Sequence, residues 1–174
     1  MIIRFLIILF SITLADSQLI SAQSKLNRIK EIQEVFKTTN SYKNLRTVKL
    51  SNEEFLENMT DGGGELTGFF KNDTLIKMSE WIGVSYGVIA IDYYFEDNEL
   101  VFSYVQEKYF PATDSTIDRT KLILKFEGRY YYERDELFAQ KNSGSGLWGD
   151  SLDKSNPILN DSKRYSKLLV AKVK

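Results

Sequence analysis

Residues 89–104 read IAIDYYFEDNELVFSY, and the alternation within this stretch decides the fold. Apolar side chains recur at every second position before and after the pair Asp97 and Asn98, which is the spacing of a half-buried β-strand. Aspartate and asparagine tolerate positive φ and favour tight turns, so the stretch predicts an antiparallel hairpin. The alternation assigns Ile89, Ile91, Tyr93 and Phe95 to one face of the first strand, and Leu100, Phe102 and Tyr104 to one face of the second.

The same order of two aromatic residues, a polar turn and a leucine occurs at residues 69–75, 94–100 and 131–137. Each unit predicts a hairpin tip. The units are unevenly spaced, whereas a solenoid or propeller needs a fixed period. A meander of about six to eight antiparallel strands is therefore expected, with one long excursion between Phe110 and Thr120. On a later strand, Leu122, Leu124 and Phe126 are expected to share a face.

Helical periodicity flanks this β region on both sides. Residues 24–38 carry an apolar stripe at spacings of three and four, with Ser24 as the expected N-cap. A second stripe follows Asp161, the expected cap of a C-terminal helix. The stripes consist of Leu26, Ile29, Ile32, Val35 and Phe36 in the first helix and Tyr165, Leu168, Leu169 and Val173 in the second. The sequence predicts an α+β fold, in which both helices pack on one face of a curved antiparallel sheet.

Residues 1–22 have the pattern of a secretory signal peptide. One positive charge, Arg4, precedes an apolar run that ends at Asp16, and this run is too short to span a bilayer. Cleavage is expected after Ala22, with Ala15 as the alternative site, which leaves residues 23–174 as a single secreted domain without a transmembrane segment. The expected destination is the periplasm or the extracellular medium.

Composition removes several classes of chemistry. The chain contains no cysteine and no histidine, so disulfides, thiolate nucleophiles, lipidated cysteines and histidine-based metal or acid–base sites are excluded. No catalytic residue, metal site or cofactor is assigned. The formal net charge is −1, without runs of like charge, which argues against nucleic acid as a partner.

Residues 61–141, from the run DGGGELTGFF onward, resemble small secreted bacterial proteins that consist of aromatic hairpins. The resemblance implies an exported antiparallel β-domain and carries no activity. Within the run, Asp61 and Glu65 flank three glycines that suit either a loop entering a strand or a small anion or calcium site. The loop is favoured because the other ligands of a calcium loop and a phosphate-binding lysine are missing.

Ligand-binding candidates come from the aromatic content of 11 phenylalanines and 10 tyrosines. Such side chains usually form core, but on an incompletely covered sheet some of them line a cleft. Trp148 lies in a Gly/Ser-rich stretch, where an indole either caps a pocket or packs back on the core. The predicted ligand-binding residues are Trp81, Tyr93, Tyr104 and Trp148.

These observations favour a non-catalytic module that binds a small molecule or an envelope or secreted protein. One alternative is a glycan hydrolase that uses a carboxylate pair drawn from Asp61, Glu65 and Glu80, since such chemistry needs no histidine. Another is a secreted inhibitor or an envelope assembly partner that presents a sheet edge or the Trp148 loop.

Overall fold

The computed structural model describes residues 2–113, 116–147 and 157–173, with side chains described from Ala22 onward. The elements in chain order are α1 (Ile2–Ser41), β1 (Arg46–Ser51), α2 (Asn52–Phe55), β2 (Gly64–Lys71), β3 (Thr74–Val84), β4 (Gly87–Glu96), β5 (Glu99–Tyr109), β6 (Ile123–Glu133), β7 (Glu136–Gly144) and α3 (Pro157–Ala171).

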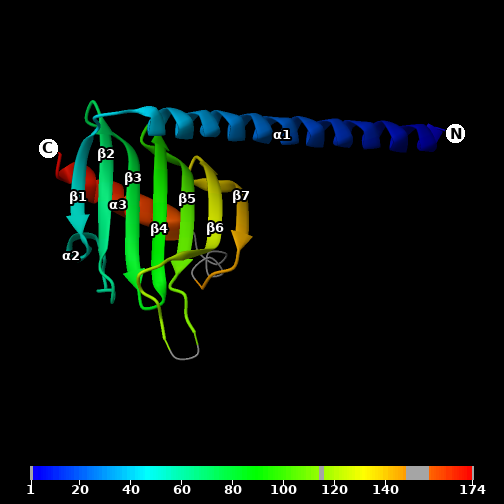
Figure 1. Cartoon of the computed structure of the whole chain (residues 1–174). Helices are drawn as coiled ribbons and strands as arrows, with labels where there is room; N and C mark the ends of the chain where they lie inside the picture. The colour runs from blue at the N-terminus through cyan, green and yellow to red at the C-terminus, as the bar shows by residue number, and fades with distance from the viewer. Residues whose placement is uncertain (1, 114–115, 148–156, 174) are drawn as a thin grey trace.

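The strands form one curved antiparallel sheet of seven strands, and their order in the sheet is their order in the chain (Figure 1). Each strand pairs only with its sequence neighbours, as in a meander. The predicted α+β fold is confirmed, including the long connection, which joins the end of β5 at Tyr109 to the start of β6 at Ile123.

The three predicted hairpin tips are confirmed. They join β2 to β3, β4 to β5 and β6 to β7. Both turn residues of each tip have positive φ, in the pairs Asn72 and Asp73, Asp97 and Asn98, and Arg134 and Asp135. Consecutive positive φ values are typical of the two-residue turn that matches the right-handed twist of a hairpin.

The helices pack on opposite faces of the sheet, so the expectation of a shared face is wrong. α3 packs with one core cluster, which includes Tyr93, and α1 packs with another, which includes Tyr94. Successive side chains of a strand point to opposite faces. Because both neighbours are large and aromatic, each face of β4 has apolar surface that a helix can cover.

Bulges overturn two of the predicted side-chain faces. The pairing shifts between Tyr94 and Phe95, so Leu100 joins the α3-side cluster whereas Phe102 joins the α1-side cluster. A second shift between Glu107 and Lys108 separates exposed Leu124 from buried Phe126. An extra residue reverses the alternation beyond it, and side-chain type alone does not indicate where it is inserted.

Both helices extend beyond their expected limits. α1 continues through Ser24, which is therefore not an N-cap, and its N-terminal part projects past β7 (Figure 1). α3 begins at Pro157 rather than at Asp161, and proline suits a first helical position because it lacks the N–H that would be unpaired there. Among the residues that the structure describes, no helix is long and apolar enough to cross a membrane.

Candidate functional site

α1 crosses one end of the sheet and is anchored at two points. Near its docked start, the Arg28 guanidinium contacts the carboxylates of Glu96, at 2.9 Å, and Glu133, at 3.7 Å. Near its end, the Asn40 amide donates a hydrogen bond to the Tyr94 hydroxyl at 3.1 Å. Ile32 lies between these anchors and is fully buried. This segment of α1 therefore forms a wall over the sheet.

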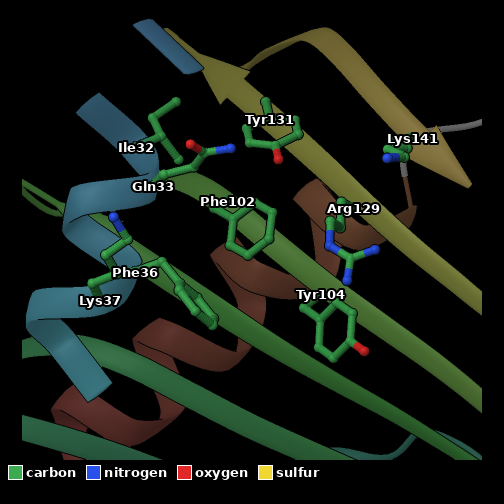
Figure 2. A pocket seen from close by; sticks show the side chains of 9 residues that line it. All are labelled: Ile32, Gln33, Phe36, Lys37, Phe102, Tyr104, Arg129, Tyr131 and Lys141. Atoms are coloured by element: carbon green, nitrogen blue, oxygen red, sulfur yellow. The ribbon is translucent and has the colours of Figure 1, made fainter. Parts of the chain in front are cut away.

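A cavity of about 520 Å³ lies between this wall and strands β5, β6 and β7 (Figure 2). Its residues are Ile32, Gln33, Phe36 and Lys37 from α1, and Phe102, Tyr104, Arg129, Tyr131 and Lys141 from the sheet. Such a volume lies within the range of small-molecule sites. The cavity combines four aromatic rings with three cationic side chains.

The aromatic part of the cavity adjoins α1. The ring centroid of Phe36 lies 5.7 Å from that of Phe102 in an edge-on arrangement, and Phe102 lies 5.1 Å from Tyr131. Phe102 and Tyr131 are directly opposite each other on β5 and β6. Tilted and edge-on contacts of this kind hold each ring in place. Phe36 remains 37% exposed and presents part of its surface to the cavity.

The next row of the sheet is charged. Strand pairing places Tyr104 opposite Arg129, and Arg129 opposite Lys141. Figure 2 shows Arg129 and Lys141 on the side of the cavity away from α1, with Phe102 between them and the helix. The cavity is therefore polarised, with rings at the end near α1 and cations at the opposite end.

Arg129 is held by its neighbours. Its guanidinium forms an ion pair with Glu127 and lies 5.1 Å from the centre of the Tyr104 ring. The Tyr104 hydroxyl donates a hydrogen bond to Glu127 at 2.8 Å, and this bond, together with Arg129 and the charge of Lys141, lowers the pKa of Glu127. Lys141 is exposed and forms no ion pair with the residues described.

A second cavity, of about 490 Å³, lies on the other face between α3 and strands β3 and β4. Glu80, only 5% exposed, accepts hydrogen bonds from Tyr93 at 2.6 Å and Tyr165 at 3.1 Å. Burial raises the pKa of Glu80 to about 7, and the negative charge of Asp161 adds to this effect against the two hydrogen bonds. Asp161 lines the same cavity and pairs with Arg164 at 3.2 Å.

The structure does not bring the predicted ligand-binding residues together. Tyr104 lines the α1-side cavity, whereas Tyr93 is fully buried on the other face as a donor to Glu80. The strand register places Trp81, 41% exposed, on the α1 side but outside the residues that line the cavity. Trp148 lies outside the described residues.

Two of the three carboxylates considered for hydrolysis lie on opposite faces of the sheet. The register places Glu65 on the α1 side, where it binds Lys49 at 2.9 Å, and Glu80 on the α3 side. Asp61 lies in the turn that enters β2 at Gly64, so the glycine run has the predicted role of a loop entering a strand. Within the described part of the chain, no group of acidic residues has the arrangement of a metal site.

Sequence reasoning missed Phe36, Arg129 and Lys141 as cavity residues. The sequence pattern predicts Phe36 as part of a packed helix stripe, whereas its free surface depends on how far α1 covers the sheet. Arg129 and Lys141 lie on different strands, and only the β6–β7 register brings them opposite each other. The hairpin tip at Arg134 and Asp135 does not supply this pair, because the β6–β7 pairing shifts by one residue between Tyr131 and Tyr132. Regular counting outward from the tip would place Gln140 opposite Arg129.

No protein-family model matches this chain, and neither does a curated protein or a solved structure.

Proposed function

We propose that this protein is an exported, non-catalytic binding module that takes a small apolar or aromatic molecule into the cavity between α1 and strands β5 to β7. The observation that carries the proposal is the set of rings from α1, β5 and β6 around one cavity of about 520 Å³.

The packing of these rings supports binding rather than a closed core. Phe102 and Tyr131 are buried, yet Phe36 above them keeps 37% of its surface exposed. An apolar ligand that covers this surface gains hydrophobic free energy and ring contacts without rearranging the sheet. The two anchors of α1 hold the wall in place, which reduces the ordering cost of binding.

The test is a titration with N-phenyl-1-naphthylamine, a neutral probe whose fluorescence rises in apolar sites. Phe36→Ala is expected to weaken probe binding by about tenfold, because it removes a ring contact and the associated buried area. Leu26→Ala is the matched control, since Leu26 lies on the same helix, is 54% exposed and does not line the cavity. Absence of binding, or equal loss in both variants, contradicts the proposal.

Export is the second part of the proposal and rests on the pattern of residues 1–22. Cleavage after Ala22 removes only residues that precede the docked segment, in which the first anchor is Arg28. The mature chain would keep the wall of the cavity. Intact mass of the protein from a secreted or periplasmic fraction checks this, with cleavage after Ala15 as the alternative result. Recovery of the uncleaved chain contradicts export by this route.

A glycan hydrolase is the second candidate, because Glu80 and Asp161 line one cavity and the pKa of Glu80 is raised to about 7. A carboxyl that is protonated near neutral pH is suited to act as a general acid beside an ionised carboxylate. The test measures the release of reducing ends from purified peptidoglycan as a function of pH. Glu80→Gln should abolish activity whereas Asp61→Asn keeps it, and an inactive native protein removes this candidate.

The inhibitor or assembly-partner hypothesis involves a sheet edge or Trp148, and Trp148 lies outside the described residues. It stays a prediction that Trp148→Ala releases a co-purifying protein.

A further inference from the structure

We infer that the ligand of the α1-side cavity is a free amphipathic anion, with a ring-sized apolar body at the end near α1 and a single negative head group at Arg129 and Lys141. This inference rests on the proposed binding function and adds the chemical class of the ligand.

The first argument is the arrangement of like charges. Arg129 and Lys141 are directly opposite each other on neighbouring strands, which places their Cβ atoms about 5 Å apart. Like charges in this position destabilise a sheet. Both side chains line the cavity, so an anion bound there relieves the repulsion.

The second argument is the charge balance at this end of the cavity. Glu127 forms an ion pair with Arg129 and also interacts electrostatically with Lys141, so one carboxylate faces two cations and a net charge of +1 remains at this end of the cavity. Lys37, the third cation, already forms an ion pair with Glu34 at 2.6 Å on the exposed surface of α1. One uncompensated positive charge favours a ligand with one negative charge rather than a polyanion.

The third argument is the preformed geometry of the head-group end. Arg129 is fixed by Glu127 and lies over the Tyr104 ring, so its guanidinium is oriented before a ligand arrives. The apolar body then lies along Phe102 toward Phe36, as the order of residues in Figure 2 indicates. Charge-assisted hydrogen bonds at one end and ring contacts at the other define the two parts of the ligand.

The test compares two probes with one aromatic skeleton. N-Phenyl-1-naphthylamine is neutral, and 1-anilinonaphthalene-8-sulfonate adds one sulfonate. The native protein is expected to bind the sulfonate at least tenfold more tightly. Lys141→Gln should weaken sulfonate binding about tenfold and change neutral-probe binding less than twofold, because it removes only a charge-assisted contact.

Two further variants control this experiment. Lys141→Arg keeps the charge and should restore most of the sulfonate affinity. Lys167→Gln removes an exposed lysine of α3 on the opposite face and should leave both affinities unchanged.

The possible failures are distinguishable. If both probes bind equally and Lys141→Gln changes neither affinity, the anion inference is wrong and the binding function stands. If neither probe binds, both proposals are wrong. Sedimentation with phosphatidylglycerol vesicles separates a free ligand from a lipid head group, and the protein is expected to stay in the supernatant. Co-sedimentation that Lys141→Gln abolishes would assign a membrane lipid and overturn the free anion.

Discussion

The two faces of the sheet each carry one helix but differ in how completely it covers them. On the α3 side, the helix lies so close to the sheet that a Cβ on Gly68 would be 2.9 Å from the Leu169 side chain. Its cluster extends from Leu50 on β1 to Tyr132 on β6. On the α1 side, the helix crosses only the end of the sheet that bears the hairpin tips (Figure 1). The row beyond the helix carries Arg129 and Lys141.

This difference in helix coverage indicates that the two faces of the sheet have different roles. The α3 face buries apolar side chains from β1 to β6 and from α3 in one cluster, and this burial favours folding. That stability lets the α1 face keep a partly exposed ring and a pair of like charges, both of which are suited to binding and unfavourable for folding. Function is therefore expected on the face that is covered less.

The largest expected effect comes from truncating one buried side chain in each of the two core clusters. Leu169→Ala should lower the free energy of unfolding by about 4 kcal/mol, because it leaves a cavity where α3 packs closely against Gly68 of β2. Ile32→Ala should lower the free energy of unfolding by roughly 2 kcal/mol. It should speed amide hydrogen exchange in α1 while the amides of the sheet stay protected. Both side chains are fully buried, so exposure does not explain the contrast. Urea unfolding and hydrogen-exchange measurements check this contrast between the two variants. Equal exchange effects on the sheet and on the helices would contradict it.

The next expected effect is a difference between the two faces in how their contribution to stability depends on pH. The pKa of Glu80 rises from 4.5 to about 7 on folding, so the folded state binds more protons in that interval. Its stabilising contribution is complete below pH 4.5 and is lost as the pH rises through 7. The difference in unfolding free energy between the native protein and Glu80→Gln should change by roughly 3 kcal/mol from pH 4 to 8.

A matched variant on the α1 side should show the opposite sign. The hydrogen bond from Tyr104, with Arg129, lowers the pKa of Glu127. The stabilisation from this carboxylate is present above its unfolded pKa and is lost as the pH falls through the folded value. Glu127→Gln should therefore reduce stability at neutral pH more than at pH 3. A pH-independent difference for either variant would contradict the assigned environments.

The smallest expected effect tests whether the like charges oppose folding. Lys141→Glu places a carboxylate opposite Arg129 and should raise the free energy of unfolding by a few tenths to about 1 kcal/mol. The same variant should lose binding of the anionic probe. Urea unfolding and the probe titration are run on the same preparation, and Lys167→Glu on α3 is the control. If Lys141→Glu is less stable than the native protein, the pair of Arg129 and Lys141 does not destabilise the fold.

The hairpin tips could be predicted from sequence because turn chemistry is local. Asn72 and Asp73, like Asp97 and Asn98, tolerate positive φ through their own side chains. The faces of Leu100 and Leu124 could not be predicted, since each depends on a bulge that reflects how two strands pair. The cavity escaped prediction for a related reason. Lys141 meets Arg129 only through the register, and Phe36 gains its exposed surface only from where α1 crosses.

The neighbour-to-neighbour order of the strands has a consequence for the folding pathway. Every pairing in the sheet joins consecutive strands, so most of it can form hairpin by hairpin, in steps of about 1–10 μs for each isolated turn. Docking of α1 is different, because the contact of Arg28 with Glu96 spans 68 positions of the chain. Closing that loop gains little until the hairpin tips exist. The protein is therefore expected to pass through a folded sheet without a binding cavity, and to acquire the cavity when α1 docks.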